Sequence, residues 1–132
     1  MRPRLLIQHI VLCLSQRFNT MSWALSDDLR QANAYLRKRR HLQALTLRAN
    51  GSTFCAGGNP FAAKVNMSLA AHCQVWYEVS HPFVELRELS VPTTAALHGR
   101  MIGGASALFL QTDVRLTDRE STFQHLPPYV YE

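Results

Sequence analysis

Two pairs of adjacent glycines are the residues of this sequence best suited to chemistry. Gly57 and Gly58 occur in "STFCAGGNPF", and Gly103 and Gly104 occur in "HGRMIGGASA". Glycine permits positive φ and lets another group approach the backbone, so each pair could present bare N–H groups to a ligand. If the pairs face each other, two N–H donors could hold one carbonyl oxygen as it gains negative charge, forming an oxyanion hole. The alternative is that each pair simply makes a tight turn.

The elements predicted around the glycines give an α/β fold. Apolar runs with the length and composition of strands are found at 5–14, 42–49, 91–99 and 113–118. Helical patterns lie between them, at 26–40, 66–88 and 103–112. Alternation of strands and helices is typical of α/β proteins. Each glycine pair follows the carboxyl end of a strand, where ligands usually bind in such sheets.

The first two helices carry their own signals. Ser26 precedes Asp28 and stands beside Asp27, which predicts that Ser26 is the N-cap of the first helix. The apolar face of this helix recurs at helical spacing, at Leu25, Leu29, Ala32 and Leu36. Pro82 either interrupts the second helix or begins its last segment.

Length and composition predict one domain that associates with other chains. The 132 residues are 47% hydrophobic, which suffices for a core, and only 17% charged, which favours covered surface. Such a chain is either a homo-oligomer or part of something larger. The net charge of +5 comes with a single dense basic run, "LRKRRH", at the end of a predicted helix. Such a run complements the helix dipole, so nucleic-acid binding is not favoured. No apolar stretch reaches the roughly 20 residues of a membrane helix.

The cysteines and the N-terminus bear on compartment. Three cysteines without metal-ligand spacing indicate neither a disulfide framework nor a metal site, and favour a reducing, cytoplasmic environment. The alternative is mitochondrial or plastid, because Arg2, Arg4 and Arg17 precede the first acidic residue, Asp27.

Two segments closely resemble the crotonase superfamily, the enoyl-CoA hydratase/isomerase proteins. They are "ALTLRANGSTFCAGGNPF" and "VPTTAALHGRMIGGASALFLQTDVRLTDRESTF", and "RFNTMS" is similar to an early turn of the family. The resemblance runs from about Ile10 to Phe123. It implies a spiral of ββα turns, truncated on its C-terminal side because the family domains are about twice as long, so that residues 1–132 are a single partial crotonase-like domain. It also implies assembly as trimers or dimers of trimers.

The resemblance assigns roles to the glycine motifs. The N–H groups of Gly58 and Gly104 would be the two oxyanion donors, and Gly57 and Gly103 would shape the thioester-binding turns beside them. The carbonyl of Ala56 would meet the adenine amino group of coenzyme A. The implied ligand is an acyl thioester of coenzyme A or of the phosphopantetheine of an acyl carrier protein, with no tightly bound cofactor and no metal. Enlarging Gly58 or Gly104 is expected to remove access to positive φ and displace the donor.

Both glutamates of the family's hydratases are missing from their expected positions. Ala107 stands three residues after Gly104, and Pro127 stands near the second position. Glu120 precedes Phe123 instead of following it, and His125 could reach the pocket. Without two carboxylates no general acid and base can be assembled for hydration.

The remaining resemblance is to the decarboxylating crotonases of polyketide β-branching, which use a lysine. Lys64 follows Gly58 by six residues and could be that lysine; a solvated loop lysine, or one near a coenzyme phosphate, is the favoured alternative. We therefore predict an acyl-thioester-binding lyase, decarboxylase or isomerase acting through an enolate. The alternative is a non-catalytic fragment or pseudoenzyme that folds by association with other chains.

Five further side chains are predicted to have structural roles. His98 should pack or form a hydrogen bond, Cys55 should be structural and not a nucleophile, and Asp113 should fix the turn before its strand. Trp76 and Tyr77, on the second helix, should be core or interface residues.

Overall fold

A computed structural model of the protein describes residues 6–58 and 67–124. The elements follow one another in the order β1 (Ile7–Leu12), η1 (Ser15–Arg17), α1 (Trp23–Arg37), β2 (Ala44–Ala49), β3 (Thr53–Cys55), α2 (Leu69–Val84), η3 (Glu85–Glu88), β4 (Thr93–Leu97), β5 (Arg100–Ile102), α3 (Ala105–Leu110), β6 (Val114–Thr117) and β7 (Thr122–Gln124). The predicted α/β class is confirmed, and every predicted helix and strand is present. The bounds are somewhat shorter than predicted except for α1, which begins and ends three residues earlier than the predicted 26–40.

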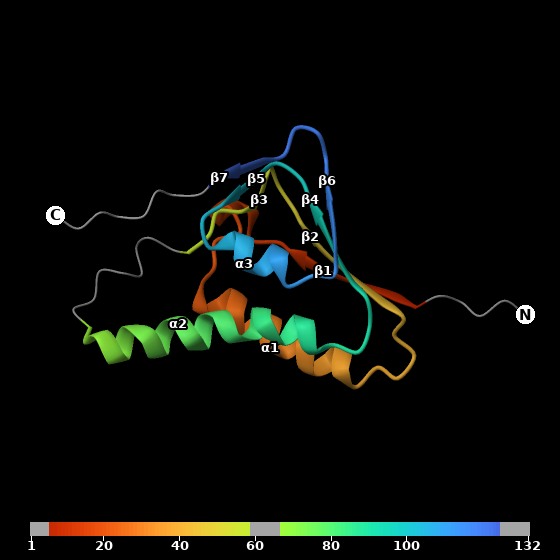
Figure 1. Cartoon of the computed structure of the whole chain (residues 1–132), viewed down its shortest axis with the longest axis horizontal. Coiled ribbons are helices and arrows are strands. Elements are labelled where there is room, and N and C mark those ends of the chain that lie inside the picture. The colour runs from red at the N-terminus through yellow and green to blue at the C-terminus, as the bar shows by residue number, and fades with distance from the viewer. Residues whose placement is uncertain (1–5, 59–66, 125–132) are drawn as a thin grey trace, which may run out of the picture.

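The strands form two parallel sheets. The larger has the order β1-β2-β4-β6 and the smaller the order β3-β5-β7. A strand of the larger sheet is followed at once by a short strand of the smaller one, and then by a helix, in β2-β3-α2 and again in β4-β5-α3. This repeat is the ββα turn that the sequence predicted. In Figure 1 the helices lie on one side of the sheets, with α3 between the sheets and the α1–α2 pair.

The N-cap prediction for α1 is wrong by one turn. Ser22 is the N-cap, and its hydroxyl accepts a hydrogen bond of 3.2 Å from the Leu25 N–H. Ser26 lies inside the helix, is fully buried, and donates from Oγ to the carbonyl of Val79 at 2.8 Å. Ser26 therefore serves the contact between α1 and α2 and not the helix start.

Pro82 lies inside α2 and does not end it. Proline lacks an N–H, so the carbonyl four residues earlier, that of Glu78, loses its helical donor. Two side chains of α1 take the place of that donor: Ser26 Oγ and Arg30 Nη2 each lie 3.3 Å from the Glu78 oxygen. Asn33 Nδ2 also donates to the Pro82 carbonyl at 2.8 Å. The two helices are thus joined by polar groups that repair the break in α2.

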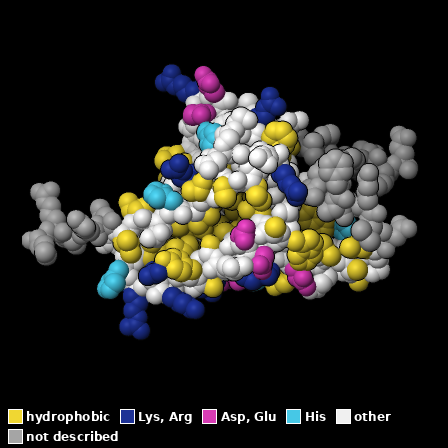
Figure 2. All heavy atoms as spheres, turned by 180° about the vertical axis from the view of Figure 1, so that it is seen from behind, with side chains coloured by type: hydrophobic (Ala, Val, Ile, Leu, Met, Phe, Trp, Pro, Cys, Tyr) yellow, Lys and Arg dark blue, Asp and Glu magenta, His cyan; other side chains and the backbone are white. Residues whose placement is uncertain are grey.

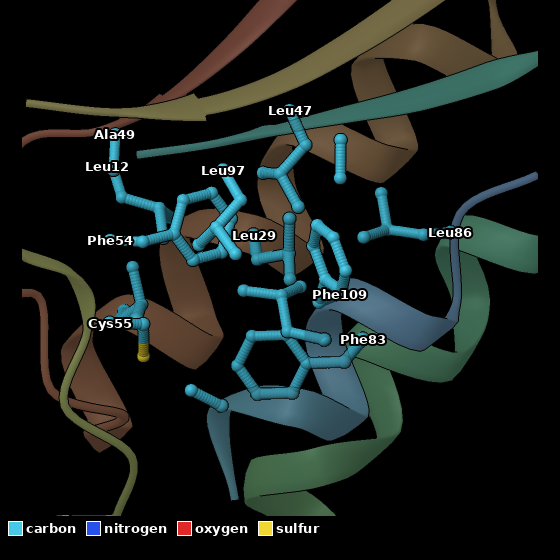
Figure 3. Close-up of a cluster of buried hydrophobic side chains, with 14 of the residues drawn as sticks. Leu12, Leu29, Leu47, Ala49, Phe54, Cys55, Phe83, Leu86, Leu97 and Phe109 are labelled. Carbon is cyan, nitrogen blue, oxygen red and sulfur yellow. The ribbon is translucent and has the colours of Figure 1, made fainter. Parts of the chain in front are cut away.

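The core lies between the larger sheet and the helices. Figure 3 shows side chains of β2, β4, α1, α2 and α3 pointing into one cluster. Alternate residues of the two central strands enter it, so Leu45 and Leu47 of β2 are almost fully buried, as is Ala95 of β4. Phe54 of β3 is completely buried and packs edge-to-face on Phe109 of α3, with ring centroids 6.1 Å apart. This contact ties the smaller sheet to the helix that follows it.

The last strand of each sheet is exposed. Every residue of β6 and β7 is exposed, including the apolar side chains of Val114, Leu116 and Phe123. Figure 2 shows apolar side chains at the surface of the face seen there, with the basic side chains mostly toward its rim. Among the described residues, no helix is long and apolar enough to cross a membrane.

Candidate functional site

The two glycine pairs meet backbone to backbone. Gly57 has a φ of +82°, and a Cβ built on it would lie 2.5 Å from the carbonyl oxygen of Ile102 and 3.3 Å from the nitrogen of Gly104. Real Cβ atoms do not approach an oxygen so closely, so only glycine fits here. The first pair is therefore a close approach to the second, and not an isolated turn.

Parallel pairing of β3 with β5 in the smaller sheet brings the two glycine turns together. β3 and β5 are parallel, with Cys55 opposite Met101, so the chain leaves both strands at the same edge. A third segment, between η1 and α1, closes the site from its other side. The N–H of Met21 donates to the Gly57 carbonyl at 2.7 Å, and the N–H of Ala56 donates to the Phe18 carbonyl at 3.0 Å.

Asn19 holds this third segment in place. Its side chain is fully buried, and Nδ2 donates to the carbonyls of Asn50 at 3.0 Å and Thr53 at 2.9 Å. Its φ of +51° is one that asparagine tolerates better than most residues. The sequence prediction did not single out Asn19 or Met21, although both lie in the "RFNTMS" segment.

Where the turns meet, two N–H groups have no acceptor within the part of the chain that the structure describes. Among the hydrogen bonds that join described residues, neither Gly58 nor Gly104 is a donor, whereas the Gly103 N–H donates to the Gln124 carbonyl at 2.8 Å. The Gly57 N–H bonds the Cys55 thiol. Gly58 is half-buried, and Gly104 is exposed at the N-cap of α3.

The expectation that Gly58 and Gly104 need positive φ is wrong. Positive φ occurs at the first glycine of each pair, with +82° at Gly57 and +55° at Gly103. Gly104 has a φ of −61°, which any residue can adopt, and a Cβ on it would make an ordinary contact of 3.7 Å with Met21 Sδ. The first glycine of each pair thus makes the turn, and the second presents its N–H.

The sequence and fold comparisons agree with this arrangement of motifs. A family model described as enoyl-CoA hydratase/isomerase matches residues 7–127. The chain belongs to the enoyl-CoA hydratase/isomerase family. It is 30% identical over 118 residues to an enoyl-CoA isomerase/hydratase of Mycosarcoma maydis, an alignment that covers 83% of this chain and 43% of that protein.

Solved structures of family members have the same fold. Human enoyl coenzyme A hydratase domain-containing protein 3 superimposes with a TM-score of 0.80 at 22% identity, covering 89% of this chain and 46% of that chain. Enoyl-CoA hydratase from Shewanella pealeana gives 0.79 at 22% identity, with 87% and 44% covered. The crotonase-like fold is therefore confirmed, and the chain spans less than half the length of these relatives.

Ala107 stands where the hydratases of the family were expected to carry their first glutamate, so the side chain there is a methyl group. Ala107 is exposed on α3, one turn after Gly104, and its N–H donates to the Gly104 carbonyl at 3.0 Å. Glu120 is exposed in the turn between β6 and β7. Lys64, His125 and Pro127 lie outside the described residues.

Of the two roles predicted for the aromatic residues of α2, the structure excludes one. Neither is a core residue, since Trp76 is 48% and Tyr77 60% exposed, and an interface role stays a prediction. The ring of Trp76 lies against Gly58: a Cβ on this glycine would be 3.0 Å from Cη2 of the indole. Trp76 therefore borders the site.

Cys55 is structural, as predicted. Its side chain is completely buried, and burial raises the pKa of the thiol, although the hydrogen bond from the Gly57 N–H acts in the opposite direction. A thiol with a raised pKa is a poor nucleophile at neutral pH. Cys55 thus lies next to the glycine turn, and its sulfur accepts a hydrogen bond from the Gly57 N–H.

The predictions for His98 and Asp113 are confirmed as well. His98 Nε2 lies 2.6 Å from the carbonyl oxygen of Gly51, in the turn between β2 and β3. Asp113 Oδ2 accepts from the Thr93 N–H at 2.8 Å and the Thr93 hydroxyl at 3.0 Å. These two bonds lower the pKa of the Asp113 carboxyl and fix the start of β6 beside β4.

Proposed function

We propose that this chain binds acyl thioesters of coenzyme A or of an acyl carrier protein, and that it does so through an oxyanion hole made by the N–H groups of Gly58 and Gly104. The thioester carbonyl oxygen would accept from both donors, and Ala56 would present its carbonyl to the adenine. The observation that carries the proposal is the contact of the two turns, in which Gly57 approaches the Gly104 nitrogen and leaves two donors unused among the described residues.

The chemistry that fits these groups passes through an enolate. Backbone N–H donors that are already in position stabilise an oxygen whose charge grows, and in other enzymes one such donor contributes about 2.7–4 kcal/mol. In a decarboxylation, the bond from the α-carbon to the carboxylate breaks, carbon dioxide leaves, and the electron pair passes to the thioester oxygen. A proton from solvent then completes the acyl product.

Hydration is disfavoured because Ala107 carries no acid or base one turn after Gly104. We therefore propose a lyase, decarboxylase or isomerase step, of the kind expected from the polyketide β-branching resemblance, with Lys64 as its candidate proton-handling group. The second candidate is a non-catalytic fragment or pseudoenzyme that folds by association with other chains. The exposed apolar residues of β6 and β7 suit such association, including association in a homo-oligomer.

Gly104→Pro tests the oxyanion assignment. Proline holds φ near the −61° observed for Gly104 but has no N–H, whereas the matched variant Gly104→Ala keeps the donor. We expect Gly104→Pro to weaken binding of acetoacetyl-CoA, which readily forms an enolate, about tenfold or more, and Gly104→Ala to weaken it less. Isothermal titration with acetoacetyl-CoA and with free coenzyme A measures both. Equal losses for the two ligands would remove the oxyanion assignment.

Turnover separates the two candidates. Release of carbon dioxide from a carboxyacyl-CoA would support the decarboxylase, and a shift of the double bond of an enoyl-CoA would support the isomerase. Binding with neither reaction would support the non-catalytic protein. Hydration of crotonyl-CoA at ordinary hydratase rates would contradict the inference that Ala107 leaves the site without the acid or base needed for hydration.

A further inference from the structure

An aromatic side chain lies against Gly58, on the side where a Cβ would stand. The atoms of Trp76 nearest to a Cβ built on Gly58 are Cη2 at 3.0 Å, Cζ3 at 3.7 Å and Cζ2 at 4.0 Å. All three are carbons of the six-membered ring, so the surface presented to the glycine is apolar. The six-membered ring thus occupies the space beside the Cα of Gly58, the residue whose N–H is the proposed donor.

The polar atom of the indole is held elsewhere. Trp76 Nε1 donates to Nε2 of His72, one turn earlier on α2, at 2.8 Å, and the two ring centroids are 6.3 Å apart. With its N–H engaged by its own helix, Trp76 can offer no hydrogen bond at the glycine. The same bond limits rotation of the ring, because a different χ2 would break it.

A second apolar side chain lies against Gly104, the other proposed donor. Met21 is buried, and its Sδ would be 3.7 Å from a Cβ on Gly104. Its backbone N–H is bonded to the Gly57 carbonyl, so the residue is fixed to the same turn. Trp76 at Gly58 and Met21 at Gly104 therefore place carbon and sulfur atoms beside the two glycines whose N–H groups have no acceptor among the described residues.

We propose that Trp76 determines which acyl groups the site accepts, and that His72 is its positioning residue. This inference rests on the proposed function. The benzo ring of Trp76 forms a wall beside the carbon next to the thioester carbonyl, so the site selects acyl thioesters that are unbranched there. A fully substituted carbon at this point would overlap the ring, and turning the ring away would break its hydrogen bond to His72.

Binding of three probes tests the wall: free coenzyme A, butyryl-CoA and pivaloyl-CoA, whose carbon next to the carbonyl bears three methyl groups. A misfit of one to two methyl groups in a shaped site changes affinity about 10-fold or more. We expect the protein to prefer butyryl-CoA over pivaloyl-CoA by about that factor, and Trp76→Ala to reduce the preference to about twofold. Tyr77→Ala, which removes the adjacent exposed ring on the same helix, should leave the preference unchanged.

A double-mutant cycle tests His72. We expect His72→Ala to lower the butyryl/pivaloyl preference in the wild-type background, because the ring is freed. In the Trp76→Phe background the same change should have no effect, because phenylalanine keeps the six-membered ring but has no N–H. This cycle decides the question even if Trp76→Ala does not fold.

Each outcome bears on one level of the inference. If no form of the protein binds butyryl-CoA more tightly than coenzyme A, the proposed function fails, and the wall fails with it. Suppose instead that butyryl-CoA binds more tightly than coenzyme A, but that Trp76→Ala has the same preference for butyryl-CoA over pivaloyl-CoA as the unaltered protein. The proposed function then stands, and the role of Trp76 as a wall is wrong. An equal effect of His72→Ala in both backgrounds would show that His72 does not act through Trp76.

Discussion

Replacing Gly57 with alanine should separate the turn-forming glycines from the donor glycines. The new Cβ would lie 2.5 Å from the Ile102 carbonyl oxygen, and the residue would have to keep a φ of +82°. Left-handed backbone costs an L-residue about 1–2 kcal/mol, and relieving an overpacked contact costs about 1–3 kcal/mol. We therefore expect Gly57→Ala to lower the free energy of unfolding by about 3 kcal/mol. Gly104→Ala meets neither penalty, since its φ is −61° and its nearest contact is 3.7 Å, so its loss should stay below about 1 kcal/mol.

Urea unfolding followed by tryptophan fluorescence measures both variants against the unaltered protein. The two midpoints should differ clearly while the slope with urea stays the same, because the surface exposed on unfolding does not change. A Gly57→Ala variant that fails to fold, beside a Gly104→Ala variant that folds, is the extreme form of the same result. Equal stability of the two variants would refute the close approach of the turns.

Three further predictions follow from the contacts described. Ser26→Ala should lower the free energy of unfolding by about 1–3 kcal/mol, because it leaves the Val79 carbonyl buried without its side-chain donor; calorimetry should show this loss, and an unchanged melting temperature would contradict it. The pKa of Asp113 is lowered by its bonds to Thr93, so this carboxylate stabilises the fold above its unfolded pKa of about 3.9, and the contribution is lost as the pH falls through the lower folded value. Unfolding of Asp113→Asn and the unaltered protein, measured from pH 7 to pH 2, should therefore differ most near neutrality and converge in acid; a constant difference would count against the pairing. Iodoacetamide should label the two exposed thiols of the folded protein and spare Cys55 until denaturant is added, as peptide mass mapping would reveal.

The sequence predicted the longer elements because their patterns are local. Helical spacing placed Leu25, Leu29 and Leu36 on the buried face of α1, and the short apolar runs marked β2 and β4. The strands β3, β5 and β7 were missed as elements because each has three residues, too few to show alternation. Without them the sequence could place each glycine turn at a strand end but could not show that the turns touch.

The errors at single residues arise from tertiary contacts. Ser26 resembles an N-cap in sequence, but it is buried because Pro82, far along the chain, leaves a carbonyl of α2 without a donor. A large aromatic residue such as Trp76 is often found in a core, yet here its ring lies on the surface of α2, against Gly58. Gly57, and not Gly58, has positive φ, and it is Gly57 that lies against the Ile102 carbonyl at the start of the other glycine turn. None of these partners is visible in the local sequence.

The parallel pairing of both sheets has a consequence for how the chain folds. Ile7 pairs with Ala44, Leu45 with Thr93 and Thr53 with Arg100, so no two of the described strands form a hairpin. Each pairing must wait until the intervening segment has been closed into a loop, which costs chain entropy before any ladder bond is gained. Helices α1 and α2, whose contacts are partly local, are therefore the elements able to form early and bring distant strands within reach. Changes that weaken either helix should slow folding, even where the final sheets are unaltered.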